Sequence, residues 1–258
     1  MLTIDLDKIK IKDGHTILDL GCGKGRHVHK LYYYKKCHVI GLDLSFDDLK
    51  VTYQGFETYP DITNDPNRHF NLMVGNALSL PFNDESFDQI ICSEVLEHIP
   101  DYKKVISEIY RVAKKDAYIG ISVPNRFPEK ICWYLSDEYH NEPGGHIHIF
   151  ENKKLINNFK EKNFYYLSKS FRHGLHSPYW WLKCYVGVKN EKNFLVNLYK
   201  KFLEWDILSR PMITRILEKL FDPIIGKSVV LYFKKESKWL RKYQLRIIQS
   251  SLKDLQKE

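Results

Sequence analysis

Residues 16–25 read Thr-Ile-Leu-Asp-Leu-Gly-Cys-Gly-Lys-Gly, an apolar strand followed at once by a turn with glycine at every second position. Glycine has no Cβ, so it adopts positive φ values and lets a ligand approach the main chain closely. A helix that starts after such a turn also points its first free N–H groups at the ligand. The stretch therefore predicts a strand–turn–helix unit that binds a nucleotide-like molecule.

Asp19, just before the turn, separates this unit from the common dinucleotide-binding turn. The dinucleotide fingerprint G-x-G-x-x-G cradles a pyrophosphate. Here the order is D-x-G-x-G-x-G, and Arg26 stands where the third glycine of the fingerprint is expected. Because opposite charges attract, a carboxylate at the strand end suits a cationic ligand, such as an ammonium or a sulfonium, better than a pyrophosphate.

The turn and four later segments together resemble the class I S-adenosylmethionine (SAM)-dependent methyltransferases, in particular the type 11-like group. The segments keep the family's order and spacing over about the first half of the chain. They read Val39-Ile40-Gly41-Leu42-Asp43-Leu44-Ser45, Gly75-Asn76-Ala77 with Leu80-Pro81-Phe82, residues 86–99, and Glu108-Ile109-Tyr110-Arg111-Val112. The resemblance implies an α/β, Rossmann-like methyltransferase fold whose seven-stranded sheet is mostly parallel, with an antiparallel last strand. It also implies SAM as methyl donor and S-adenosylhomocysteine as product.

Strand patterns alternate with helical patterns along the first 170 residues, as a parallel sheet with crossover helices requires. Strands are expected at residues 15–20, 38–43, 70–74, 87–93, 117–124, 164–170 and 229–233. Helices are expected at residues 25–35, 47–56, 101–113 and 151–162.

The connection between the last two expected strands, residues 171–226, is far longer than the usual ~2–6 residues. It holds three tryptophans, Trp180, Trp181 and Trp205. We therefore expect a helical cap here that binds the methyl acceptor, inserted into a SAM-binding core made of residues 1–170. Residues 227–258 would supply the final strand and a basic amphipathic C-terminal helix.

The resemblance implies a role for the residues of the donor site. The glycine turn would pass along the methionine part of SAM, with Asp19 near its ammonium group. Asp43 would accept hydrogen bonds from both ribose hydroxyls, and Leu44 would lie against the adenine. The expected cofactor-binding residues are Asp19, Gly21, Cys22, Gly23, Gly25, Asp43, Leu44, Asn76, Ala77 and Ser93. The alternative for Asp43 and Asn76 is that they only form turns, in which both residue types are common.

Three histidines are candidate bases, since a neutral imidazole can take a proton near pH 7. His146 and His148 follow the fifth expected strand, and alternation would turn them to the same side. Their alternative is a purely structural, hydrogen-bonding role. His98 follows the fourth strand, and its alternative is that Glu97 and His98 only start and cap a helix. No metal site is expected, because a zinc site with His140 would need further ligands at a recognisable spacing.

Candidate acceptor-binding residues come from two places. Glu94, at the end of the fourth expected strand, could orient a hydroxyl or an ammonium group of the acceptor. The insertion adds a cluster of aromatic and polar side chains, which supply apolar walls and fix orientation. This cluster is Arg172, His173, His176, Tyr179 and Trp180. The alternative for Trp180 is that it anchors the cap to the sheet.

The formal charge of +8 is unevenly spread. Residues 226–258 hold nine Lys/Arg and three Asp/Glu, so the rest of the chain is nearly neutral. A nearly neutral catalytic half disfavours a nucleic-acid acceptor. The basic C-terminal helix leaves three options open, namely packing on its own domain, a contact in a homodimer, or a helix on a membrane surface. The chain is expected to be a monomer or a homodimer.

Cysteine spacing and hydropathy give an expectation for the cellular compartment of the protein. The five cysteines lack C-x-x-C spacing, the chain does not start with a signal peptide, and no apolar run approaches the ~18 residues that cross a bilayer. These features indicate a cytoplasmic protein.

The sequence as a whole predicts a SAM-dependent methyltransferase that acts on a small or amphipathic acceptor, with lipid-like molecules among the candidates. The favoured acceptor atom is oxygen, and nitrogen and carbon are the alternatives. An RNA methyltransferase is one alternative, which is disfavoured because Ser93-Glu94-Val95-Leu96 stands where an N-P-P-Y-type tetrad would follow the fourth strand. A non-catalytic SAM-binding regulator is the other.

Overall fold

The structure is a computed structural model, and it describes residues 2–57, 67–142, 144–190 and 192–236. These residues form a seven-stranded sheet of order β3-β2-β1-β4-β5-β7-β6. Its strands are β1 (Thr16–Leu20), β2 (His38–Asp43), β3 (His69–Val74), β4 (Phe87–Ser93), β5 (Ala113–Pro124), β6 (Phe164–Arg172) and β7 (Ser228–Lys235). β7 runs antiparallel to both β5 and β6, and the other pairs are parallel. The predicted Rossmann-like methyltransferase fold is confirmed.

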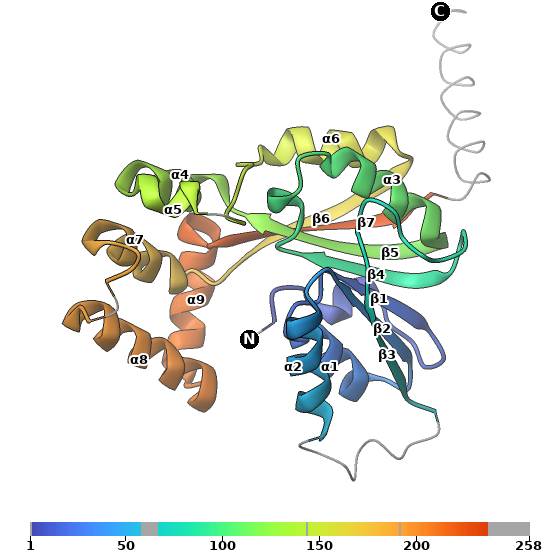
Figure 1. The fold of residues 1–258 in the computed structure, drawn as a ribbon, viewed down its shortest axis with the longest axis horizontal. Helices are drawn as coiled ribbons and strands as arrows, with labels where there is room; N and C mark the ends of the chain where they lie inside the picture. Colours follow the sequence, from blue (N-terminus) through green and yellow to red (C-terminus); the bar gives the residue numbers. More distant parts are fainter. Residues whose placement is uncertain (1, 58–66, 143, 191, 237–258) are drawn as a thin grey trace, which may run out of the picture.

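Helices cover both faces of this sheet (Figure 1). One face carries α3 (Tyr102–Val112) and α6 (Asn152–Glu161), and the other carries α1 (Arg26–Tyr34) and α2 (Phe46–Glu57). All four lie within two residues of the helices that the sequence predicts. Because both faces are covered, most residues of the central strands β1 and β4 are buried and apolar, and the buried polar exceptions include Asp19 and Gln89.

Alternation along β1 divides the buried residues into two cores. Ile17 packs in the core with Val28 of α1, whereas Leu18 packs in the core with Val105 and Ile109 of α3. Successive side chains of a strand point to opposite faces, so one short apolar strand serves both cores. The strand is thereby held rigidly at the base of the glycine turn.

The sequence missed two helices and the start of β5. Between β5 and residues 144–150 lie α4 (Arg126–Leu135) and α5 (Asp137–Asn141). Pro128 falls in the first turn of α4, where a missing N–H costs no helical hydrogen bond. β5 begins at Ala113 rather than at 117, because an irregular stretch in which Asp116 has a φ of 64° still pairs with β4.

The long connection between β6 and β7 holds three helices, α7 (His176–Val186), α8 (Phe194–Ser209) and α9 (Met212–Ile225). They lie beyond one end of the sheet, beside α4 and α5 (Figure 1). Trp181 of α7 donates a hydrogen bond to the Pro128 carbonyl of α4, at 3.1 Å. The N–H of Gly174 donates to Asp222 of α9 at 2.7 Å, so the connection is tied to the sheet edge at both ends.

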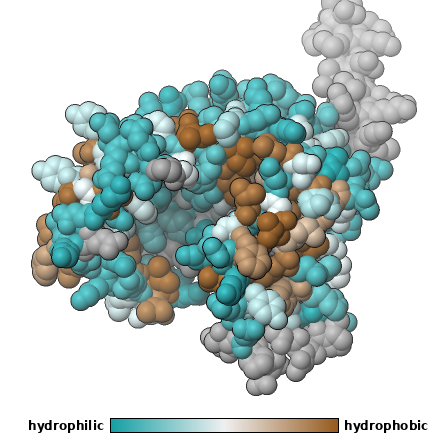
Figure 2. Space-filling view, in the orientation of Figure 1, coloured by the Kyte–Doolittle hydropathy of each residue, from teal (hydrophilic) through white to brown (hydrophobic). Residues whose placement is uncertain are grey.

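Many large apolar side chains of α8 and α9 are exposed, and Figure 2 shows some of them at the lower left, over α8. They are Phe194, Leu195, Leu198, Trp205, Ile207, Leu208, Met212, Ile213, Ile216, Leu220, Phe221 and Ile224.

The expected amphipathic helix after residue 236 lies outside the described residues. Within the described ranges, no helix combines the length and the apolar composition that a membrane crossing requires. The five cysteines are free and buried.

Candidate functional site

The glycine turn at the end of β1 has the backbone that the sequence requires. Gly21, Gly23 and Gly25 have φ values of 70°, 50° and 80°. A Cβ on Gly21 would lie 2.3 Å from Cγ2 of Val95, so this position admits only glycine without movement. The N–H groups of Gly21 and Cys22 both donate to the Leu42 carbonyl, which ties the turn to β2.

Asp43, the last residue of β2, fixes the turn from the other side. One carboxylate oxygen accepts from the Gly23 N–H at 2.7 Å and the other accepts from the Ser45 N–H at 2.9 Å. Each oxygen keeps a second lone pair for another donor. Leu44, next to it, is 75 % exposed and offers an apolar surface beside the carboxylate.

Asp19 is the most unusual group of this edge. It is 1 % exposed, and neither of its carboxylate oxygens has a hydrogen-bond partner among the described residues. Burial raises the pKa of Asp19 to about 7, although the positive charge of Arg26 opposes this. An unpaired buried carboxylate is costly, and a bound cation would remove that cost.

The remaining expected donor residues lie at the same carboxyl edge of the sheet. The side-chain oxygen of Asn76 accepts a hydrogen bond from the Leu78 N–H at 2.9 Å. Asn76 therefore does stabilise a turn, which was the alternative to a role in SAM binding. Ser93, at the end of β4, is buried and shares a hydrogen bond with Ser122 at 2.9 Å. Neither contact prevents a further hydrogen bond to a ligand, because the amide and the hydroxyl each keep a free donor or acceptor.

Residues 11–175 match the family model described as "Methyltransferase domain". The chain belongs to this family. Among curated relatives, the methyltransferase domain is 29 % identical over 143 residues to a sterol 24-C-methyltransferase of Gibberella zeae, covering 55 % of this chain and 34 % of the relative. It is 35 % identical over 136 residues to a demethylmenaquinone methyltransferase of Lactobacillus johnsonii, covering 49 % of this chain and 52 % of the relative. The chain thus spans a third to about half of the length of these two relatives.

Solved structures share the fold of the methyltransferase domain. A SAM-dependent methyltransferase of Methanosarcina mazei superposes with a TM-score of 0.61 at 16 % identity, covering 92 % of this chain and 100 % of that one. A phosphoethanolamine N-methyltransferase of Haemonchus contortus, solved with SAM, superposes with a TM-score of 0.60 at 18 % identity. The superposition covers 90 % of this chain and 51 % of that one.

SAM is the methyl donor of this family, and the geometry fits it. The unpaired carboxylate of Asp19 suits the ammonium group, and the outward lone pairs of Asp43 suit the ribose hydroxyls. When bound, SAM would supply the electrophilic methyl group on a sulfonium.

A pocket of about 510 Å³ opens between the end of β4, the end of β6 and α7. Five of the six expected acceptor-binding residues line it, namely Glu94, His173, His176, Tyr179 and Trp180. The sequence did not indicate Lys227 as part of this pocket. Its ammonium lies 4.9 Å from the ring centre of Trp180, a contact that joins the start of β7 to α7. Burial lowers the pKa of His176 to about 4, so its imidazole is neutral at pH 7.

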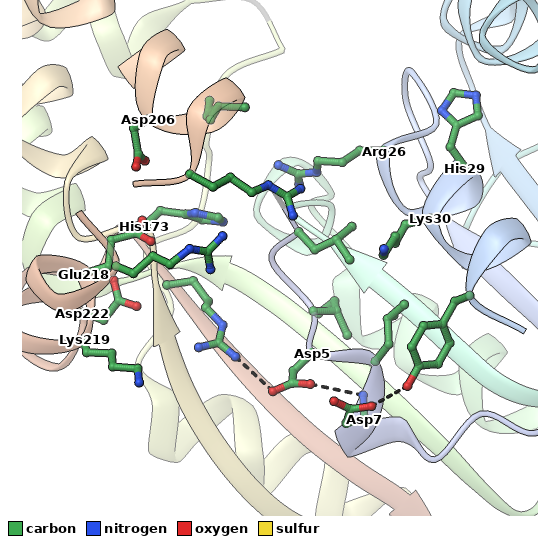
Figure 3. A pocket seen from close by; sticks show the side chains of 18 of the residues that line it. Asp5, Asp7, Arg26, His29, Lys30, His173, Asp206, Glu218, Lys219 and Asp222 are labelled. Carbon is green, nitrogen blue, oxygen red and sulfur yellow. Dashed lines mark hydrogen bonds and ion pairs between the residues drawn. The ribbon is translucent and has the colours of Figure 1, made fainter. Parts of the chain in front are cut away.

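The sixth expected residue, Arg172, lines a second and larger pocket of about 890 Å³. Figure 3 shows Arg26, His29 and Lys30 of α1 on one side and Asp206 with the acidic groups of α9 on the other. Arg172 donates to Asp5 at 3.2 Å, so its charge is engaged at the N-terminal edge of this pocket. Arg26 and His173 line both pockets, which are therefore contiguous.

The three candidate bases lie near one another but have different partners. His146 Nδ1 lies 2.6 Å from a carboxylate oxygen of Glu129, a residue of α4 that is 2 % exposed. Burial alone would raise the pKa of Glu129. The hydrogen bond and the charge of His146 act in the opposite direction, and the pKa of Glu129 lies below its ordinary value. His148 instead donates through Nε2 to the Ile99 carbonyl at 3.1 Å and packs on the ring of Tyr102.

At this end of β4 the structure differs from one alternative and from one expectation of the sequence analysis. Leu96–His98 forms a 3₁₀ turn rather than the start of a helix, and Asp101 caps α3 by accepting from the Lys104 N–H. Residues 145–150 form no strand, because the N–H groups of Ile147 and His148 both donate to the single carbonyl of Glu97 instead of to a neighbouring strand. The directions in which the side chains of His146 and His148 point are therefore not set by strand alternation.

Proposed function

We propose that this methyltransferase domain transfers the methyl group of SAM to a hydroxyl oxygen of a small or amphipathic, lipid-like acceptor. The observation that carries the proposal is the pocket in which Glu94, directly after β4, meets the aromatic residues of α7. Its volume of about 510 Å³ falls in the range of small-molecule sites. A polymer would need an open basic groove instead.

The two curated relatives support an apolar acceptor. One is named for methylation of a sterol carbon and the other for demethylmenaquinone, and both acceptors are lipid-like. The exposed apolar side chains of α8 and α9 lie next to the pocket residues Leu203 and Ile207, so an amphipathic molecule would meet apolar surface at the mouth as well.

The proposed reaction is an in-line displacement. The acceptor oxygen attacks the sulfonium methyl group, the carbon–sulfur bond breaks, and its electron pair stays on sulfur. Most of the rate enhancement in such a site comes from holding the two reacting atoms close and aligned. A base then only has to remove the hydroxyl proton.

His146 is the better supported base of the three histidines. Its Nδ1 donates to the ionised Glu129, which leaves Nε2 as the acceptor and orients the ring, as in other carboxylate–histidine pairs. His98 and His148 each donate to a neutral carbonyl, that of Gly145 and that of Ile99. Neither carbonyl would stabilise an imidazolium as the carboxylate of Glu129 would stabilise that of His146.

Radiolabelled SAM incubated with fractionated lysate tests the proposal. We expect label in the lipid or small-metabolite pool, with His146→Ala reducing transfer ~100-fold or more and His148→Ala changing it far less. Label confined to the RNA pool would show that the acceptor is RNA rather than a lipid-like molecule. Calorimetric SAM binding without transfer to any pool would favour the non-catalytic regulator.

A further inference from the structure

A compact cluster of ligand-type side chains lies beside the acceptor pocket, and we call it the Glu97 cluster. It consists of Glu97 and His98 in the 3₁₀ turn after β4 and of His146 in the loop before α6. One carboxylate oxygen and one nitrogen from each ring lie within 4.8 Å of one another. The rings of His98 and His146 are 5.0 Å apart.

Glu97 is 0 % exposed, and both of its carboxylate oxygens lack a hydrogen-bond partner among the described residues. One of them lies 4.0 Å from Nε2 of His98, so the carboxylate faces the two imidazoles. A buried carboxylate in this state is paired or coordinates a metal in folded proteins. Glu94 and Glu129 add further negative charge nearby, and Lys227 offsets part of it.

In both histidines Nδ1 already donates a hydrogen bond. His98 donates through Nδ1 to the Gly145 carbonyl at 3.1 Å, and His146 donates through Nδ1 to Glu129 at 2.6 Å. In each ring Nε2 therefore carries a lone pair. Metal-binding histidines show this arrangement, because a carbonyl or carboxylate behind the ring fixes the tautomer and makes the ligand nitrogen more basic.

We propose that Glu97, His98 and His146 bind a divalent transition-metal ion of the zinc class. Two imidazoles and one carboxylate form a set that zinc uses in catalytic sites, where a fourth position stays open for water or substrate. Imidazole ligands favour zinc and its transition-metal neighbours over magnesium or calcium. Ligand atoms of a tetrahedral zinc ion are separated by about 3.3 Å, so the cluster would close by up to about 1.5 Å through side-chain rotation.

The Glu97 cluster is connected to the acceptor pocket through Tyr139. The ring of Tyr139 lies 6.0 Å from that of His146 and 5.8 Å from that of Trp180, which lines the pocket. The negative charge of Glu94, another pocket residue, acts directly on Glu97. The open coordination position can therefore receive an acceptor oxygen.

The catalytic part of this inference rests on the function proposed above. The bound ion would polarise the acceptor hydroxyl, whose O–H bond breaks as the proton passes to the Glu94 carboxylate. The freed oxygen lone pair then forms the O–CH₃ bond while the carbon–sulfur electron pair stays on sulfur. In the metal-bound protein His146 would hold the ion rather than take the proton.

The binding test uses the untagged full chain, freed of metal by chelation, with Co²⁺ and Zn²⁺ as probes. We expect one equivalent of Co²⁺ to bind with the visible absorption of a tetrahedral site, and Zn²⁺ to displace it. His98→Ala and His146→Ala should each weaken binding ~100-fold or more. Glu129→Gln, which keeps all three ligands but loosens His146, should weaken it ~10–100-fold.

His38→Ala is the matched control, because His38 and His69 form a surface pair with rings 6.0 Å apart on β2 and β3. It should leave metal binding unchanged. Binding of less than one equivalent by the wild-type protein would overturn the proposal, and so would equal affinity in the His98 and His146 variants. Circular dichroism melting of each variant confirms that it is folded.

Turnover is measured separately, with labelled SAM and the acceptor fraction. We expect chelation to reduce methyl transfer at least tenfold and Zn²⁺ to restore it, whereas unchanged turnover in metal-free protein would overturn the catalytic role. Failure of the proposed function would differ, since transfer would then be absent with and without metal while the Co²⁺ stoichiometry stays intact.

Discussion

The donor side and the acceptor side of this molecule are built in different ways. On the donor side, backbone groups of the glycine turn bond to Asp43 and Leu42, all within the first 43 residues. On the acceptor side, side chains that follow β4 and β6, side chains of α7 and α8, and side chains at the start of β7 converge on one pocket. The family match ends at residue 175, immediately before α7 begins at His176.

This difference shows which part of the molecule the family comparison describes. Backbone hydrogen bonds and positive φ values tolerate sequence change at most neighbouring positions, so the donor side is shared with distant relatives. The proposed acceptor pocket depends on particular side chains, several of them from α7 and α8, which lie outside the residues that the family model matches. The comparison predicts that donor-side changes impair SAM binding, whereas changes in α7 impair acceptor binding alone.

The largest expected effect is that of Asp43→Ala. It removes the proposed acceptor of two ribose hydroxyls and the anchor of Gly23. Loss of two charge-assisted hydrogen bonds should weaken SAM binding by about 3 kcal/mol or ~100-fold. Titration calorimetry with S-adenosylhomocysteine measures this. Asp47→Ala, an exposed acid in the first turn of α2, is the control and should bind as wild type does. Equal affinity in both variants would contradict the assigned role of Asp43.

Gly21→Ala should cost a similar amount in folding free energy. The positive φ costs about 1–2 kcal/mol, and the clash with Val95 adds about 1–3 kcal/mol. Gly14→Ala is the matched control, because Gly14 has a φ of 80° but no atom within 4 Å of its ideal Cβ. Urea unfolding should show Gly14→Ala to be clearly milder. If Val95→Ala does not restore part of the stability of Gly21→Ala, the clash is not the cause.

Trp180→Ala tests the acceptor side. Removing a pocket aromatic should raise the KM for the acceptor ~30-fold, equivalent to about 2 kcal/mol, and leave SAM affinity unchanged. Tyr185→Ala, also on α7 but 76 % exposed, should have little effect on either. A Trp180→Ala protein with weakened SAM binding would break the division between the two sides.

Most of the fold was predictable from the sequence, because it depends on short-range patterns. β2 and β4 match the predicted ranges at both ends, since each apolar run stops where the polar carboxyl edge begins. α4 was missed because Pro128 reads as a helix breaker unless its position in the first turn is known. β5 was predicted too short because its first residues are charged.

The candidate sites were predictable to different degrees. The glycine turn and Asp43 lie close together in the sequence, and a motif identifies them. Glu129 carried no such signal, because its partner His146 lies beyond two helices. The ligand character of Glu97 was hidden for the same reason, since it faces a histidine from a distant loop. Contacts of this kind depend on the folded chain rather than on local pattern.

The smallest expected effect concerns pH and Asp19. In the free protein burial raises the pKa of this carboxyl to about 7, above its value in an unfolded chain. Its contribution to stability is therefore present at low pH and lost as the pH rises through about 7. A bound cation reverses the preference, because it stabilises the carboxylate. SAM binding below pH 7 should thus release up to one proton, and affinity should rise about tenfold per pH unit before levelling above pH 7.

Calorimetry in two buffers of different ionisation enthalpy counts the released proton, and Asp19→Asn should abolish the release. S-adenosylhomocysteine is the matched ligand, since it keeps the ammonium group of SAM but lacks the sulfonium charge. If Asp19 faces the ammonium, both ligands show the same pH dependence. If only SAM shows it, the carboxylate acts on the sulfonium. Proton release that persists in Asp19→Asn would remove Asp19 from the donor site and leave Asp43 as its acidic group.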